Sequence, residues 1–215
     1  MSSTIDLQIA EIWCSKLCHD LVSPVGAVCN GVEFLQDSGA AAAADASDLI
    51  AQSANMASDR LQFYRSAYGA AGSQMVMSVN EACQTAGAYL QWSKTTLQSP
   101  GTNGSKVLPE GLGKVFLNVV ALLESGLVYG GDIEIDLEGD LAQPEGVLTG
   151  FSLTALGRRV SLSHGEPDAL AGEVDPAEVT PRTVHAYMTG IFARHLGKQA
   201  SLTGEDETRL SIRIC

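Results

Sequence analysis

The sequence predicts an α+β protein, with an N-terminal helical hairpin followed by a sandwich of strands and helices. Residues 5–68 contain a single proline and place apolar residues every three or four positions, which is typical of packed helices. Residues 75–215 contain the other six prolines, and their short β-like and helical runs follow no regular βαβ order. We expect a hairpin over residues 1–70 and a second domain over residues 74–215, separated by a Gly- and Ala-rich break.

The first helix has a heptad pattern that predicts the seam of a helical bundle. One heptad position holds Leu7, Cys14, Leu21, Val28 and Leu35, and the other holds Ala10, Leu17, Pro24 and Gly31. The second helix begins near Asp45 or Ser47, either of which can cap it. Its apolar stripe is Ile50, Ala54, Ala57, Leu61, Tyr64 and Tyr68. Two helices enclose no core alone, so we expect a homodimer whose two hairpins form a four-helix bundle; packing on the second domain is the alternative.

The second domain mixes strands and helices, with the helices expected on one face of a sheet. An alternation of apolar and acidic residues predicts a strand over 133–137 with one solvent-facing side, and a strongly apolar run predicts a buried helix over 112–127. The other expected elements are helices over 80–93 (capped by Asn80) and 181–196, strands over 75–79, 147–156 and 159–163, and a closing hairpin of strands 199–203 and 208–214.

Composition excludes several classes of partner. The 215 residues are 45% hydrophobic, and 13 Lys and Arg against 25 Asp and Glu give a net charge of −12. Such a charge argues against nucleic-acid and membrane-surface binding, which require clustered basic residues. We find no run long enough to span a membrane and no signal peptide, and the five cysteines contain no CxxC pair. We therefore expect a cytoplasmic protein whose partners are proteins.

His19 is the residue that points to a function. At 100° per residue it lies roughly opposite the heptad seam, so the pattern predicts an exposed side chain with no packing role. Lys16 and Ser23 flank it on the helix surface. Pro24 lies inside the helix, where it costs roughly 3 kcal/mol and introduces a kink. Such a local violation of helix rules next to an exposed histidine indicates a functional site.

The residues around His19 carry a specific resemblance. The run His-Asp-Leu-Val-Ser-Pro-Val at 19–25 resembles the phosphoacceptor box of two-component histidine kinases. The longer run 17–35 closely resembles the ChpT family of bacterial histidine phosphotransferases. This resemblance implies a dimerisation and histidine-phosphotransfer hairpin followed by a degenerate domain of the histidine-kinase (Bergerat/GHKL) ATP-binding type.

The expected ATP site lacks its essential residues. Kinases of this type carry two asparagines four residues apart, the second of which binds Mg²⁺; here Asn118 matches the first, but Leu122 stands at the second. An apolar side chain cannot bind a cation that requires oxygen ligands. The Asp-x-Gly-x-Gly box and the glycine-rich phosphate lid are also missing. We therefore expect no bound cofactor and no metal, since Cys14, Cys18 and His19 also lack a fourth ligand.

The resemblance implies a phosphorelay step through His19. The phosphoryl group passes from an aspartyl phosphate on one receiver domain to the Nε2 atom of His19, and then to an aspartate of another receiver. A neutral imidazole is the nucleophile. Asp20 orients or polarises the ring, Lys16 offsets phosphoryl charge, and Ser23 is a hydrogen-bonding neighbour. The receiver supplies the Mg²⁺.

Receiver docking is expected at an apolar stripe beside this site. Ile5, Ile9 and Ile12 lie off the heptad seam on the same side as Lys16 and Ser23, although the second domain or a dimer partner would also cover them. The implied partners are the receiver domain of a hybrid histidine kinase and response regulators of the cell cycle. Two alternatives remain: an active histidine kinase with a divergent ATP site, and a non-catalytic module that binds receivers.

Overall fold

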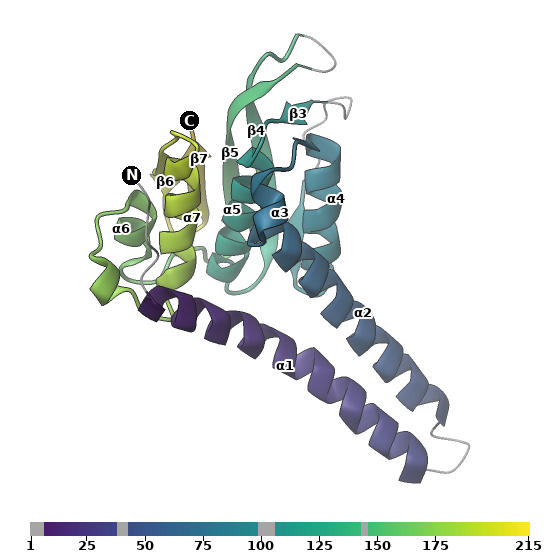
Figure 1. The fold of residues 1–215 in the computed structure, drawn as a ribbon. Helices are drawn as coiled ribbons and strands as arrows, with labels where there is room; N and C mark the ends of the chain where they lie inside the picture. The colour runs from purple at the N-terminus through teal and green to yellow at the C-terminus, as the bar shows by residue number, and fades with distance from the viewer. Residues whose placement is uncertain (1–6, 38–42, 99–105, 143–145) are drawn as a thin grey trace.

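Two long helices form the N-terminal part of the protein. The computed structural model describes residues 7–37, 43–98, 106–142 and 146–215. Helices α1 (Leu7–Asp37) and α2 (Ala43–Ala67) are followed by the short helix α3 (Ala70–Ser73). Figure 1 shows that α1 and α2 lie side by side at their distal ends and separate toward the rest of the chain. The predicted helical hairpin is confirmed.

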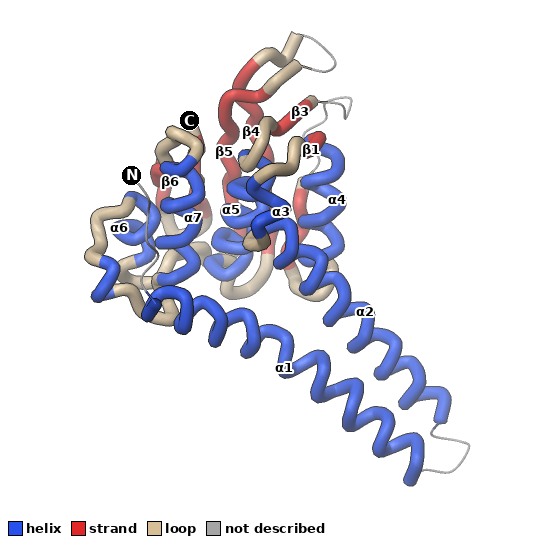
Figure 2. The backbone as a smooth tube through the Cα atoms, in the orientation of Figure 1, coloured by secondary structure: helices blue, strands red, loops and turns tan. Residues whose placement is uncertain are grey.

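The remaining elements form an α/β sandwich, also as predicted. One sheet has the strand order β2-β4-β5-β7-β6, with β2 parallel to β4 and the other neighbours antiparallel, while β1 and β3 pair separately. Helices α4, α5 and α7 lie side by side on one face of the larger sheet (Figures 1 and 2). The bounds are β1 Met77–Ser78, α4 Val79–Leu90, β2 Thr95–Leu97, β3 Val107–Leu108, α5 Leu112–Gly126, β4 Gly131–Gly139, β5 Leu148–Gly157, α6 Glu166–Ala171, η1 Pro176–Glu178, α7 Val184–His195, β6 Ala200–Glu205 and β7 Arg209–Ile214.

Apolar patterning explains the two central layers of this sandwich. In β4, Ile133 and Ile135 are buried, whereas the alternating residues Glu134 and Asp136 are exposed, which confirms the expected one-sided strand. Nearly every residue of α5 is buried, because that helix lies between the sheet and the neighbouring helices. The run 112–127 is therefore the central helix of the domain, as its composition predicts.

The buried face of α1 differs from the predicted heptad at its N-terminal end. Leu7 is 72% exposed and Cys14 is exposed, whereas Ile9 (2% exposed) and Trp13 (9% exposed) belong to the core. In this part of α1, Trp13 lies beside His185 of α7 (5.7 Å between ring centroids), whereas α1 and α2 lie side by side toward their distal ends (Figure 1). The second domain therefore covers a different face of the helix from the one that α2 covers, which a single heptad cannot describe.

Some local predictions on the other elements are wrong. In α2, Ala54 and Leu61 are exposed, so the predicted stripe is only partly buried. Helix α4 is capped by Ser78 rather than by Asn80: the Ser78 hydroxyl accepts from the Glu81 N–H, and the Glu81 carboxylate accepts from the Ser78 N–H. The expected strand over 159–163 is reduced to a single bridge between Val160 and Leu127.

The hairpin and the sandwich share one hydrophobic core. Ile9 and Trp13 of α1, and Phe63 and Tyr64 of α2, are in the same cluster as the buried residues of α5 and α7. The division into residues 1–70 and 74–215 therefore stays a prediction. No helix within the described ranges is both long enough and apolar enough to cross a membrane.

Candidate functional site

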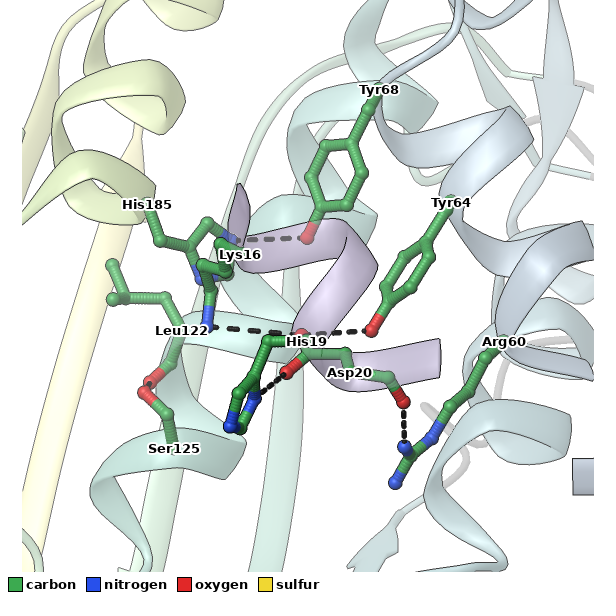
Figure 3. A network of polar contacts seen from close by, with 9 residues as sticks. All are labelled: Lys16, His19, Asp20, Arg60, Tyr64, Tyr68, Leu122, Ser125 and His185. Atoms are coloured by element: carbon green, nitrogen blue, oxygen red, sulfur yellow. Dashed lines mark hydrogen bonds and ion pairs between the residues drawn. The ribbon is translucent and has the colours of Figure 1, made fainter. Parts of the chain in front are cut away.

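His19 presents its ring to solvent from the middle of α1. Its side chain is 90% exposed, and its Nδ1 atom lies 3.5 Å from Oδ1 of the next residue, Asp20. The other ring nitrogen, Nε2, lies across the imidazole from this contact. Figure 3 shows the ring beside Asp20. The predicted exposure of His19 and its proximity to Asp20 are thus both present in the structure.

Asp20 connects the two helices of the hairpin. Its carboxylate oxygen Oδ2 accepts a hydrogen bond of 3.0 Å from the Tyr64 hydroxyl on α2. The ammonium group of Lys16, one turn earlier on α1, lies 3.9 Å from the same oxygen. The two carboxylate oxygens therefore have different neighbours, because Oδ1 faces His19 and Oδ2 faces Tyr64 and Lys16 (Figure 3).

Pro24 explains a second contact between the helices. In an α-helix the carbonyl of residue 20 accepts from the N–H of residue 24, but proline has no N–H. The Asp20 carbonyl instead accepts a hydrogen bond from the guanidinium of Arg60 on α2. Pro24 itself is buried, and α1 continues as a helix through it. The proline thus frees a backbone acceptor on the residue next to His19, and the opposite helix supplies its donor.

A cleft of about 220 Å³ lies behind this constellation, between the hairpin and the second domain. Lys16 and Asp20 of α1, Arg60 and Tyr64 of α2, and Glu124 of α5 line it together with other residues. Burial raises the pKa of the Glu124 carboxyl, while the cations Arg60 and Lys16 oppose that shift. The cleft therefore brings charges from three elements to the inner side of the His19 site.

Buried rings stabilise the wall of the cleft. Burial, the most important cause, and the neighbouring Tyr89 and Asp20 raise the pKa of Tyr64 far above its ordinary value. Tyr68 is also fully protonated, because burial raises its pKa. Its hydroxyl lies 3.5 Å from Nε2 of His185 on α7, and burial and then Lys16 lower the pKa of His185 to about 3. His185 is therefore a neutral structural residue at the junction of the hairpin and the second domain.

The expected docking stripe of isoleucines is not an exposed surface. Ile5 lies outside the described residues. Ile9 is 2% exposed inside the core, and Ile12 is partly buried against it. The prediction that Ile9 and Ile12 form an exposed receiver-docking surface is wrong, because the second domain covers this side of α1. Ser23, by contrast, is exposed one turn beyond His19.

Asn118 and Leu122, the two residues that the sequence analysis compares with a kinase nucleotide site, do not fit Mg²⁺ and ATP. Asn118 is fully buried, and its amide nitrogen donates to the backbone carbonyls of Ala67 (2.6 Å) and Lys114 (2.9 Å). Its Oδ1 atom is buried with no hydrogen-bond partner, so no ligand reaches it. Leu122 is also fully buried and offers no oxygen. Among the described side chains, none of the His, Cys, Asp and Glu groups forms a cluster of three suited to a metal ion.

Arg60 is a site residue that the sequence analysis missed, and Lys114 is a buried structural residue that it also missed. Lys114 is 6% exposed and donates to the Tyr68 and Gly69 carbonyls (3.2 Å each) and to the Ser73 hydroxyl (3.0 Å). It thereby ties α5 to the end of α2. The signal for Arg60 is indirect: Pro24 leaves the Asp20 carbonyl without a partner, which requires a donor from elsewhere.

Known proteins resemble this chain over most of its length. A family model described as "Histidine phosphotransferase C-terminal domain" matches residues 79–208. "Protein phosphotransferase ChpT" of Brucella abortus (strain 2308) is 33% identical over 203 residues, which are 93% of each protein. The solved "1.7 Angstrom Structure of a Bacterial Phosphotransferase" has a TM-score of 0.77 and 28% identity, covering 99% of this chain and 98% of that one. The Acinetobacter baumannii histidine kinase AdeS is more distant, with a TM-score of 0.41 and 8% identity over 91% of this chain and 95% of that one.

Proposed function

Because the chain belongs to the histidine phosphotransferase family, we propose that it carries a phosphoryl group between the aspartates of two receiver domains, with His19 as the carrier and without ATP. The observation that supports this role is the position of His19. It is a 90% exposed imidazole on a helical hairpin, with a carboxylate beside Nδ1 and the rest of the ring open to a partner.

The transfer needs no proton movement on the ring. Nε2 forms a bond to phosphorus as the bond between phosphorus and the aspartyl oxygen of the receiver breaks, and the electron pair of that bond stays on the receiver's carboxylate. The Nδ1 proton remains in place, so positive charge develops on the imidazole. The Asp20 carboxylate, 3.5 Å from Nδ1, offsets this charge. The reverse step passes the group to the second receiver.

Lys16 and Ser23 are proposed as neighbours of the transferring group. Lys16 lies one turn from His19 and is held near Asp20, so its ammonium group supplies positive charge at the edge of the site. Ser23 is exposed four residues beyond His19, where its hydroxyl is available to a phosphoryl oxygen or to the partner. The Mg²⁺ that neutralises the phosphoryl group belongs to the receiver domain.

We also propose that the protein acts as a homodimer. The hairpin exposes several large apolar side chains: Val22 (67%), Val25 (50%), Phe34 (52%), Leu49 (50%) and Leu61 (53%). Residues of this kind on a two-helix hairpin fit the seam of a four-helix bundle made with a second hairpin. The partners are the receiver of a hybrid histidine kinase and response regulators, and the cell cycle is the process that the family resemblance suggests.

Phosphotransfer from a receiver tests the function. The protein is incubated with a receiver domain that has been phosphorylated with acetyl phosphate and freed of the reagent, and acid-labile, base-stable phosphate on the chain is measured. We expect the label on the wild-type chain and none on His19→Gln, which keeps a polar side chain of similar size. Label on the His19→Gln variant would show that another residue is the carrier.

A further inference from the structure

We propose that Arg60 and Tyr64 of α2 are positioning residues for the transfer: together they hold the backbone and the side chain of Asp20, and through Asp20 they set the ring of His19. This inference rests on the proposed function, because it concerns how His19 is made ready to accept the phosphoryl group. Neither residue is expected to touch the phosphoryl group, so both act through Asp20.

The backbone contact comes from Arg60. Pro24 removes the N–H that the Asp20 carbonyl would accept in a regular helix, and the Arg60 guanidinium donates to that carbonyl instead. Without this donor, a partly buried carbonyl next to the phosphoacceptor would be left unpaired. The contact fixes the backbone of the residue that follows His19, so it also limits how the α1 backbone moves at His19.

The side-chain contact comes from Tyr64. Its hydroxyl donates to Asp20 Oδ2 at 3.0 Å, and its ring is 8% exposed. The rings of Tyr68 and Phe63 lie 5.4 Å and 6.1 Å from it, centroid to centroid, so neighbouring aromatic residues hold it in place. Because burial raises its pKa far above neutral, the hydroxyl keeps its proton and remains a donor.

Both donors belong to one stretch of α2 that also contacts the second domain. Arg60 and Tyr64 are four residues apart, so they lie on the same face of that helix and reach the same residue of α1. The adjacent Asp59 accepts hydrogen bonds of 2.9 Å from Gln91 Nε2 and Trp92 Nε1, at the end of α4. The second domain therefore fixes the part of α2 that contacts Asp20. In this way the domain contributes to the His19 site even though it binds no nucleotide in this proposal.

The consequence for His19 is a defined protonation pattern. With Oδ2 occupied by Tyr64 and Lys16, Oδ1 is the oxygen that faces Nδ1 of His19. A carboxylate accepts and does not donate, so the ring proton belongs on Nδ1 and the lone pair on Nε2. Nε2 is then the nucleophile, and it lies across the ring from the Asp20 contact, on a side chain that is 90% exposed. Without the two donors, Asp20 is free to turn away, and the ring loses its preference for this tautomer.

The first test uses phosphoramidate as the phosphoryl donor, which removes receiver docking from the measurement. Nε2 forms a bond to phosphorus as the P–N bond of phosphoramidate breaks, and the leaving nitrogen departs as ammonia with a proton from water. We expect Tyr64→Phe and Arg60→Met each to phosphorylate His19 about tenfold more slowly than wild type, the scale of one charge-assisted hydrogen bond.

Two controls separate positioning from general loss of structure. His164 is exposed elsewhere in the same chain, so its rate of phosphorylation should not change in either variant. Tyr68→Phe keeps the ring that packs on Tyr64 and removes only the hydroxyl, which contacts His185 rather than Asp20, so its His19 rate should stay within about twofold of wild type. A fall at His19 and His164 together would indicate altered folding and overturn the proposal.

The second test reads the ring directly. Nitrogen NMR of ¹⁵N-histidine-labelled protein should show His19 mainly with its proton on Nδ1 in wild type, and a shift toward the Nε2-protonated tautomer in Tyr64→Phe.

A double variant gives a third test. In an Asp20→Ala background, adding Tyr64→Phe should not change the rate of His19 phosphorylation further, because Tyr64 acts only through Asp20. An unchanged tautomer, or additive effects in the double variant, would refute the proposal. If His19→Gln still takes phosphate from a phosphorylated receiver, the proposed function itself fails; if only these tests fail, the function stands.

Discussion

Lowering the pH from about 7.5 to about 5 should destabilise the protein by about 2 kcal/mol through one buried histidine, His185. Its side chain lies where α7 meets α1, α5 and the end of α2, beside Trp13 of α1 (5.7 Å between ring centroids), Tyr68 just after α2 and the Asn118 backbone of α5. It is 4% exposed, and burial and then the positive charge of Lys16 lower its pKa from 6.5 to about 3.

The sign of the effect follows from proton binding. Below about pH 6.5 the unfolded chain binds a proton at this histidine, whereas the folded chain does not until about pH 3. Stability is therefore fully present above pH 6.5 and falls as the pH drops through that window. One pH unit inside the window is worth about 1.4 kcal/mol, so the roughly 1.5 units between 6.5 and about 5 give about 2 kcal/mol.

Urea unfolding at the two pH values measures this effect, with His185→Gln as the control. Carboxylates also titrate in this range, and burial raises the pKa of Glu124 and Glu166, which opposes the histidine because folded carboxyls then retain protons more readily. These contributions are common to both proteins, so they cancel in the comparison. We expect the wild type to lose about 2 kcal/mol more than the variant. Equal losses would refute the idea that His185 is buried in its neutral form at this junction.

Three further results are expected. Gly190→Ala should destabilise the fold by about 1–3 kcal/mol, because its Cβ would lie 2.3 Å from the buried Leu170 carbonyl oxygen, while Gly87→Ala, with nothing within 4 Å of its Cβ, should stabilise α4 by about 0.5–1 kcal/mol in the same urea experiment. Calorimetry should detect no binding of Mg-ATP, since Asn118 and Leu122 are both fully buried, and a measured affinity would count against a degenerate nucleotide site. Light scattering should give twice the 22.5-kDa chain mass, and Leu61→Glu should shift the protein to monomer if the exposed hairpin residues form the dimer seam.

The parts of the fold that could be predicted from the sequence are those set by local patterning. Apolar and acidic residues alternate over 133–137, so only a strand places all the apolar ones on one buried face. The dense apolar run 112–127 requires a helix that is buried on nearly all sides. β4 and α5 therefore lie where the sequence predicts. The His19 segment could be identified for a similar reason: a histidine expected to be exposed, an acidic neighbour and a proline inside the helix lie within six residues.

The rest depends on contacts that sequence spacing does not reveal. The heptad on α1 assumes one partner for the whole helix, but α2 and α7 cover different parts of it, so Trp13 is buried and Cys14 is exposed. The partners of Asp20 lie 40 and 44 residues away on α2. Periodicity places Tyr64 on the packed side of its helix, yet it gives no sign that the hydroxyl reaches a carboxylate on α1.

The nitrogen that carries the phosphoryl group is the most direct test of the proposed role of His19. Phosphorus NMR, combined with mass mapping, is applied to the chain after incubation with a phosphorylated receiver domain. We predict one phosphohistidine signal, from phosphate on Nε2 of His19, and no such signal from His19→Gln. A phosphate on Nδ1, on another histidine, or on an aspartate of this chain would contradict the assignment.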